Sequence, residues 1–287
     1  MAEAKIGVIG GSGLYHIEGM TEVEEIKVKT PFGEPSDTII LGNLENVTVA
    51  FLPRHGKGHR ISPNEVPARA NIYALKTLGV ERIISVAAVG SLREEIEPLH
   101  LVIPDQLIDR TKNRVDTFFS GGIVGHVPFA EPFCSILNQV LLEAAQETAI
   151  QVHKGGIYLA MEGPQFSTKA ESNLYRSWGG DIIGMTALPE AKLVREAEIC
   201  YACLAFVTDY DCWNDVYESV TTEMILDNLK KNVETAKEIL RLTIPRLSQT
   251  RDCPCASALQ NALATSPKRI PEHVKKELAP LIGKYIK

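Results

Sequence analysis

The feature that most constrains the fold of this chain is a continuous apolar run from Ile199 to Thr208. Its β-branched and aromatic residues predict a strand that is buried on both faces, as in the sheets of α/β proteins. The strand leads into Asp209, Tyr210 and Asp211. Because residues two apart in extended backbone share a face, we expect Asp209 and Asp211 to point into one pocket. On its own, such a pair of acids is about as often a solvated turn or a helix cap.

Strands and helices alternate along the rest of the chain. Strands are expected at residues 5–9, 38–41, 47–52, 82–86, 101–108, 155–161 and 181–185, with a hairpin turn at Gly42-Asn43. Helices are expected at residues 64–78, 133–148, 168–178, 189–196 and 221–243, and a long loop at 110–132. This alternation predicts an α/β fold, a single domain with a central mixed β-sheet flanked by helices.

We expect this domain to cover residues 1–245 and a partly helical tail to cover residues 246–287. The tail is less regular up to Pro271, where a weak basic helix is expected to begin. Two interpretations of the tail stay open, because the sequence fits both packing on a neighbouring subunit and a surface appendage.

The composition excludes several classes of protein. Of the 287 residues, 45% are hydrophobic and 23% are charged, which is typical of a globular protein. The formal net charge of -6 argues against a nucleic-acid partner. The sequence has no long uninterrupted apolar segment, so no membrane span is predicted. Because Met1 to Ile9 does not resemble a signal peptide either, we expect a cytoplasmic protein.

Several strand ends carry groups that suit an anion. Gly10-Gly11-Ser12-Gly13 follows the first strand, but it matches neither the dinucleotide fingerprint nor a P-loop. The other strand ends carry Arg54-His55, Ala87-Ala88 and Thr186. Each group alone is more often structural, but together, at one sheet edge, they predict a site for a single phosphate.

Nine sequence blocks resemble the trimeric nucleoside phosphorylase family, and within it the enzymes that act on 5′-methylthioadenosine. They span most of the first 245 residues in order: IGVIGGSGL (6–14), TPFGEPSD (30–37), RHG (54–56), GSLREEI (90–96), DQLIDRT (105–111), AEPFC (130–134), EGPQFST (162–168), MTALPE (185–190) and TDYDCW (208–213). The resemblance implies a homotrimer or a dimer of trimers. It also implies that inorganic phosphate, as co-substrate, attacks the anomeric carbon and displaces adenine, with no other cofactor.

The resemblance also implies a role for each matching residue. Phosphate would be held by Ser12, Arg54, His55, the Ala87 backbone, Ala88 and Thr186. The nucleoside would contact Met185, Phe166, Asp209, Tyr210, Asp211 and, from a neighbouring subunit, His126. Specificity would depend on Ser167 near the base and on His59, Thr222, Ile225 and Leu226 around the 5′ substituent. Ala87 departs from the family pattern, because relatives can carry Thr there.

The chemistry of this reaction assigns roles to the two acids. Adenine is a poor leaving group as an anion, so a proton or strong hydrogen bond at purine nitrogen 7 is needed. We expect Asp209 to supply it from a buried carboxyl, and Asp211 to accept from the exocyclic 6-amino group. Two alternatives are an enzyme with broader adenosine, inosine and guanosine specificity and, less favoured, a non-catalytic nucleotide-binding module.

The histidines and cysteines are the residues that could form a metal site or a disulfide. His55, His59 and His126 are not at metal-ligand spacing, so we expect no metal. Cys200 and Cys203 fall inside the expected buried strand and are interpreted as small buried side chains. Cys253-Pro254-Cys255 resembles a motif of some heat-stable relatives that can be disulfide-linked, and both free thiols and a disulfide stay open.

Overall fold

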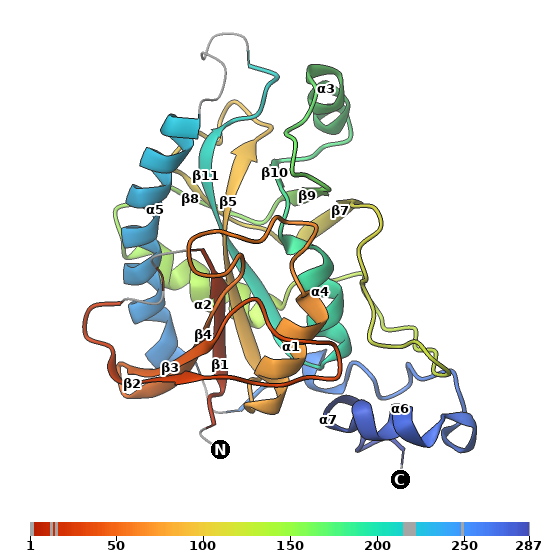
Figure 1. Cartoon of the computed structure of the whole chain (residues 1–287). Helices are drawn as coiled ribbons and strands as arrows, with labels where there is room; N and C mark the ends of the chain where they lie inside the picture. Colours follow the sequence, from red (N-terminus) through yellow and green to blue (C-terminus); the bar gives the residue numbers. More distant parts are fainter. Residues whose placement is uncertain (1–2, 12–13, 15–16, 215–221, 248–249, 287) are drawn as a thin grey trace.

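The computed structural model describes residues 3–11, 14, 17–214, 222–247 and 250–286, with only the backbone at 222–227 and 229. Within these residues, one mixed sheet of eleven strands forms the centre, and helices cover both of its faces (Figure 1). The prediction of an α/β fold with a central mixed sheet is therefore confirmed.

The strands are β1 (Ile6–Gly10), β2 (Thr21–Ile26), β3 (Ile39–Leu44), β4 (Val47–Pro53), β5 (Arg82–Ser91), β6 (Leu101–Ile103), β7 (Gln106–Arg110), β8 (Val152–Lys154), β9 (Ile157–Met161), β10 (Ile182–Gly184) and β11 (Cys200–Tyr210). The α-helices are α1 (Ala68–Thr77), α2 (Ser135–Gln146), α3 (Lys169–Ser177), α4 (Ala187–Glu196), α5 (Thr222–Thr243), α6 (Glu272–Glu277) and α7 (Ala279–Ile282). Short 3-10 turns include Pro254–Ser257.

Strand β5 is the centre of the sheet because it pairs with three others. Its first half lies parallel to β1, from Arg82 to Ser85, and its whole length lies parallel to β11. At its far end, Gly90 and Ser91 pair with the antiparallel strand β10. Between Ser85 and Gly90, the edge of β5 that faces away from β11 has no strand partner among the described residues. The sheet therefore forks here, and a gap opens between the ends of β1 and β10.

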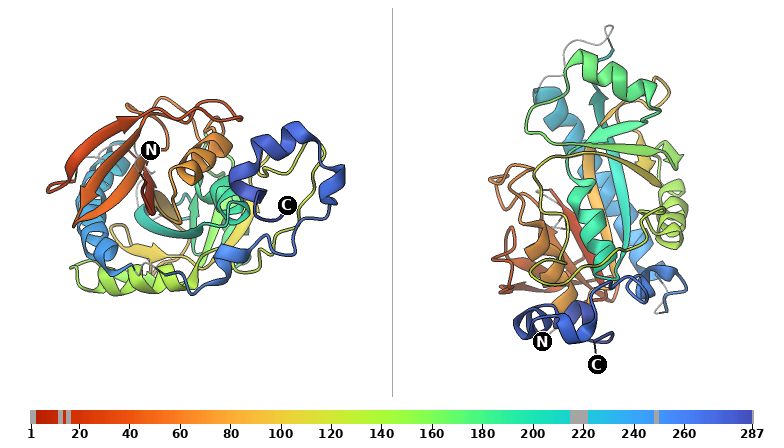
Figure 2. Two further views of the ribbon diagram at one scale, coloured as in Figure 1. Left: turned by 90° about the horizontal axis from the view of Figure 1, so that it is seen from below. Right: turned by 90° about the vertical axis from the view of Figure 1, so that its right-hand side faces the viewer.

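Apolar helix faces close the sheet from both sides. Helices α2 and α5 pack on one face, where their buried residues meet those of β1, β6 and β11. Helices α1 and α4 pack on the other face, and Figure 2 shows the two layers from below. Strand β11 is buried along nearly its entire length, as its apolar sequence predicts.

The C-terminal tail packs on the body of its own chain. Val274, Leu278 and Ile282 are buried in the same core cluster as helices α1 and α4. The hydroxyl of Tyr73 in α1 donates to the carbonyl of Glu277 at 2.7 Å. In Figure 1, α6 and α7 accordingly lie beside the lower ends of α1 and α4.

Four expected boundaries were wrong for reasons that the structure shows. The turn between β3 and β4 lies at Glu45 and Asn46, which both have positive φ, and not at Gly42-Asn43. A side chain at Gly42 would collide with Met20, whose nearest atom is 2.7 Å from the position of a Cβ. Helix α1 begins only after Pro67, which is its N-cap residue.

The other two errors concern strands. Strand β5 extends to Ser91 instead of ending at Val86, because β11 pairs with it along its length. The expected strand at 101–108 is divided at Pro104-Asp105 into β6, which pairs with β11 and β8, and β7, which pairs with β9. A proline has no N–H to contribute to a strand ladder, which accounts for the break.

The described helices include none that is both long and apolar enough to cross a membrane.

Candidate functional site

Asp209 and Asp211 lie together at the carboxyl end of β11. A β-bulge at Thr208 shifts the register, so that Val207 pairs with Val89 but Asp209 pairs with Gly90. A Cβ on Gly90 would lie 3.2 Å from Asp209 Oδ1 and 3.5 Å from Asp211 Cβ. Both acids therefore border Gly90, as their two-residue spacing predicts, and a side chain at Gly90 would crowd them. Bulges of this kind redirect side chains next to active sites.

Helix α5 stabilises the bulge through two asparagines that were not identified from the sequence. Asn228 Nδ2 donates to the carbonyl of Thr208 at 2.7 Å, and Asn232 Nδ2 donates to the carbonyl of Val207 at 3.3 Å. They satisfy carbonyls at a place where the strand ladder is irregular. Their spacing of one helical turn is the only sequence signal, and it is shared by many surface helices.

The environment of the acids favours protonated carboxyl groups. The pKa of Asp209 is raised to about 6, mainly by burial and in smaller part by the nearby charge of Asp211, against a hydrogen bond from Thr208 that lowers it. The Thr208 hydroxyl donates to Asp209 Oδ2 at 2.7 Å, with the Val89 carbonyl as a second acceptor at 3.2 Å. Burial also raises the pKa of Asp211, against the hydroxyls of Ser172 and Ser167 and the N–H of Cys212, which lower it. Within ordinary hydrogen-bond distance, Asp211 Oδ2 has no partner among the described residues.

The gap in the sheet presents groups that suit an anion. Alternate residues of a strand direct their N–H groups to opposite edges. The Val86 carbonyl faces the gap, since it accepts from Arg54 Nη1 at 3.0 Å, and Ala88 therefore directs its N–H to the same edge. Ala88 is also exposed, whereas Ala87 and Val89 are buried. The N–H of Ala87 faces β11, so of these two residues it is Ala88 that directs its N–H into the gap.

Thr186 lies on the other side of this gap. Since β10 is antiparallel to β5 and Ile183 pairs with Gly90, the following residues run back toward the level of Ala87. Thr186 directly precedes α4, whose backbone is kinked at Leu188, so the regular helical turns begin only at Pro189. Its hydroxyl oxygen is buried and has no hydrogen-bond partner in the described part of the chain. Such an orphan hydroxyl is the expected state of a ligand contact.

Arg54 lies at the base of the gap in a buried ion pair. Its side chain is 3% exposed and donates from Nε and Nη2 to the two carboxylate oxygens of Glu190. Nη2 also donates to Ser85 Oγ at 2.7 Å. Although burial opposes the charge, Glu190 raises the pKa of Arg54 above its ordinary value. Most of the guanidinium is therefore engaged inside the protein, and only one Nη1 proton is left for a ligand. The sequence did not indicate Glu190 as the partner.

His55 is held in one tautomer next to Arg54. Its Nδ1 donates to the Ile61 carbonyl at 2.8 Å, which leaves Nε2 to accept when the ring is neutral. Burial, together with the charge of Arg54, lowers the pKa of His55 to about 4. The ring stacks on His59 with centroids 4.4 Å apart, and His59 itself is exposed.

Arg114, from the long loop 110–132, fixes the turn that carries Met185 and Thr186. Its Nη1 donates to the carbonyls of Met185 and Leu188, both at 2.7 Å, and its Nε donates to Glu162 at 3.1 Å. Met185 is half-buried beside the Leu159 and Ile183 cluster. Arg114 was not identified from the sequence, since a single arginine in a long loop carries no distinctive pattern.

Several predicted residues are not brought to this place within one chain. The Tyr210 hydroxyl donates to the Glu94 carbonyl at 2.9 Å, and its ring packs on Trp213, so the side chain lies away from the two acids. Phe166 is 63% exposed. Ser167, by contrast, lies next to the acids, because its carbonyl accepts from Cys212 Sγ at 3.2 Å and its hydroxyl is close enough to lower the pKa of Asp211. His126 lies beside the tail, where its backbone N–H donates to the Ala262 carbonyl. Its contact with a neighbouring subunit stays a prediction.

Ser12 lies outside the described residues, and so do the side chains of Thr222, Ile225 and Leu226. The prediction that these residues hold phosphate or border the 5′ substituent stays a prediction.

The two halves of the site are separated by a short span. Ala88 and Gly90 are two residues apart on β5, which corresponds to about 7 Å along a strand. An anion at the Ala88 N–H and a ring system at the two acids can therefore be joined by a group of the size of a pentose.

Comparison with known proteins identifies the family. A family model described as the phosphorylase superfamily matches residues 5–245. The chain is 56% identical to the S-methyl-5′-thioadenosine phosphorylase of Geobacter sulfurreducens, over 99% of this chain and 100% of the relative. It is 54% identical to the protein of the same name from Koribacter versatilis, over 99% and 97% of the two chains.

Solved structures agree with these relatives. A methylthioadenosine phosphorylase from an Antarctic soil metagenomic library superposes with a TM-score of 0.94 at 49% identity, covering 98% of this chain and 99% of that one. A double mutant of the adenosine/methylthioadenosine phosphorylase of Schistosoma mansoni, in complex with adenine, gives a TM-score of 0.81 at 37% identity, covering 90% and 96%. The resemblance inferred from the sequence blocks is confirmed, and the chain belongs to the phosphorylase superfamily.

Proposed function

We propose that this chain catalyses the phosphorolysis of S-methyl-5′-thioadenosine to adenine and 5-methylthioribose 1-phosphate. The names of the relatives support this assignment. The observation that carries it is the pairing of two acids above Gly90, half-buried Asp209 and buried Asp211, with an anion-binding gap at Ala88 and Thr186, about 7 Å away along β5. A ribose placed across this span has its base at the acids and its anomeric carbon above the phosphate.

Phosphate is the co-substrate and the nucleophile. Its donors are the Ala88 N–H, the Thr186 hydroxyl and the remaining Nη1 proton of Arg54. Fixing phosphate beneath the sugar supplies both proximity and the negative charge that stabilises the cationic sugar in the transition state. No other cofactor is required by this chemistry.

Asp209 supplies the proton that the departing adenine needs at nitrogen 7. With a pKa of about 6, roughly a tenth of this carboxyl is protonated at neutral pH. Oδ2 is engaged by Thr208, so Oδ1, which lies over Gly90, is the oxygen that faces the base. When the carboxyl takes up a proton at Oδ1, the Thr208 hydroxyl continues to donate to Oδ2, and the proton faces the base. In both protonation states of Asp209, the Thr208 hydroxyl therefore has an acceptor for its hydrogen.

Asp211 accepts from the 6-amino group of adenine. Its Oδ2 is the buried acceptor that the described residues leave without a partner. A 6-oxopurine offers an acceptor at this position and would leave two acceptors facing each other, which is unfavourable. The site therefore discriminates for adenine nucleosides over inosine and guanosine.

Initial rates with methylthioadenosine, adenosine and inosine, each with and without inorganic phosphate, test the assignment. We expect phosphate-dependent release of adenine, fastest from methylthioadenosine, and slow turnover of inosine. Inosine as the best substrate would assign the chain to a purine nucleoside phosphorylase of broader specificity. Nucleoside binding without phosphate-dependent turnover would refute an enzymatic role.

The assembly is proposed to be a homotrimer or a dimer of trimers, in which His126 reaches the site of a neighbouring subunit. Native mass spectrometry gives the subunit number directly. A variant in which His126 is replaced by Ala then tests the contact, with an increase in KM for the nucleoside expected and an unchanged assembly as the control.

A further inference from the structure

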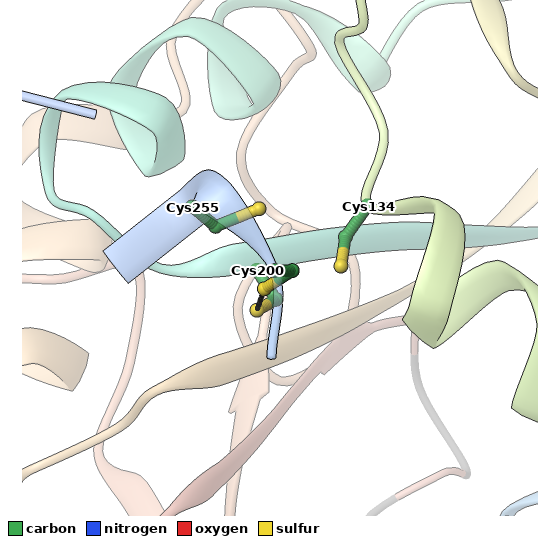
Figure 3. Close-up of side chains that lie close together, drawn as sticks. Cys134, Cys200 and Cys255 are labelled. Carbon is green, nitrogen blue, oxygen red and sulfur yellow. Dashed lines mark hydrogen bonds between the residues drawn. The ribbon is translucent and has the colours of Figure 1, made fainter. Parts of the chain in front are cut away.

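Four of the six cysteines converge at the end of the sheet opposite the candidate active site. Cys134 precedes α2, Cys200 begins β11, and Cys253 and Cys255 flank Pro254 in the tail. Their four sulfur atoms all lie within 4.8 Å of one another. Figure 3 shows Cys134, Cys200 and Cys255 approaching from three separate segments with their sulfur atoms turned to a common space.

The position of this cluster separates it from the reaction. Cys200 and Asp209 are at opposite ends of β11, nine residues apart, which corresponds to about 30 Å of strand. Cys203, on the same strand, is buried in the core on the other face of the sheet, as the sequence interpretation predicts, and does not join the cluster. All six cysteines are free thiols in the structure.

The spacing of the sulfur atoms matches the demands of a tetrahedral metal site. A zinc ion binds thiolates at about 2.3 Å, which places tetrahedral sulfur atoms about 3.8 Å from each other. The sulfur atoms of the cluster lie at most 4.8 Å apart, and the Cys200 and Cys253 sulfurs are 3.3 Å apart, so these distances lie on both sides of the expected value. A single disulfide would use two of the four sulfur atoms and would leave the other two beside it as free thiols.

The surroundings of the cluster suit its negative charge. Four thiolates around a divalent cation carry a net charge of minus two. Arg195, which is buried, places Nη1 3.8 Å from Cys255 Sγ and is held by a hydrogen bond to the Glu131 carbonyl. Cys134 is the N-cap residue of α2, a helix of 12 residues, where the positive end of the helix dipole stabilises a thiolate.

We propose that Cys134, Cys200, Cys253 and Cys255 bind one Zn²⁺ ion as a closed tetrathiolate site with a structural role. All four positions are filled by protein, so the ion has no open position for a substrate. Binding releases the thiol protons and joins the loop before α2, the start of β11 and the C-terminal tail. The expectation of no metal, which rested on the histidines, would then be incomplete.

Metal analysis of the full-length protein, purified without chelators, tests the proposal directly. We expect about one zinc per chain, which should be lost in Cys253→Ser and in Cys255→Ser. Cys203→Ala is the control and should retain the zinc, because Cys203 lies on the same strand as Cys200 but outside the cluster. Replacing zinc with Co²⁺ under reducing conditions should produce the intense sulfur-to-cobalt charge-transfer absorption of a tetrathiolate site. This spectrum can be recorded on the unmodified chain, even where a cysteine variant fails to fold.

Three results would overturn the proposal. The first is an unmodified protein with no bound metal and no cobalt spectrum after reconstitution. The second is an intact mass two hydrogens below that of the reduced chain, which would show a disulfide in place of the metal. The third is full zinc content in both tail variants, which would place the ion elsewhere. None of these outcomes bears on phosphorolysis, so the two proposals can fail independently.

Discussion

Replacing Asp209 with Asn should abolish most turnover and at the same time stabilise the folded protein at neutral and alkaline pH. Asn is nearly isosteric, and its carbonyl oxygen can still accept from Thr208, so the bulge of β11 should persist. The variant cannot deliver a proton to the base, and loss of general acid assistance typically costs about two to four orders of magnitude in rate. The opposite effects on activity and stability follow from the same cause, the burial of the carboxyl.

The stability gain can be worked out from the pKa. Burial raises it from the ordinary 3.8 to about 6, and each unit corresponds to 1.36 kcal/mol. The unfolded chain loses its proton first as the pH rises, so the folded state is penalised progressively between about pH 4 and pH 6. The penalty is about 1.6 kcal/mol at pH 5 and reaches its full value of about 3 kcal/mol at pH 8. Asn carries no charge and escapes this penalty.

Urea unfolding of both proteins at about pH 5 and pH 8, at one subunit concentration, measures the effect. The advantage of Asp209→Asn should grow by about 1.4 kcal/mol between the two pH values. Glu238→Gln, which changes an exposed acid of α5, is the control and should show no such growth. An advantage that is equal at both pH values, or near-normal turnover in Asp209→Asn, would show that Asp209 is not the buried proton donor.

Three further predictions concern the phosphate gap and the acids. Thr186→Ala should raise KM for phosphate by about 10- to 150-fold, from the loss of a hydrogen bond to a charged group, with Thr186→Ser restoring it; equal KM values in phosphate titrations would exclude the contact. Glu190→Gln should lower the free energy of unfolding by about 3–5 kcal/mol, because Arg54 would lose its buried counter-charge, and an unchanged urea midpoint would contradict this role. The kcat of the unmodified enzyme should fall as the pH rises above about 6, where Asp209 loses its proton, and a flat profile between about pH 6 and 8 would count against it.

The parts of the fold that could be predicted are those whose cause is local. The apolar run of β11 is buried wherever it lies, so its sequence was sufficient to place it. The two-residue spacing of Asp209 and Asp211 likewise placed both acids at one position. By contrast, Ala87 to Ser91 contains small residues typical of a turn, and only the distant partner β11 makes this segment a strand.

The features that were missed depend on contacts between distant segments. Nothing near Arg54 in the sequence indicates that Glu190 neutralises it, and nothing near Asn228 indicates that it supports a bulge. The four cysteines are separated by spacings that match no common metal motif, except for the short pair in the tail. Only the packing of the tail against β11 brings them together.

The way the tail is folded into the body has a consequence for synthesis of the protein. Val274, Leu278 and Ile282 help to complete the core around α1 and α4, yet they leave the ribosome well after those helices. The nascent chain must therefore wait with part of its apolar surface uncovered until this segment has emerged. A truncated product that lacks this segment should be recognised by chaperones and proteases, even though every residue of the candidate active site has already been made.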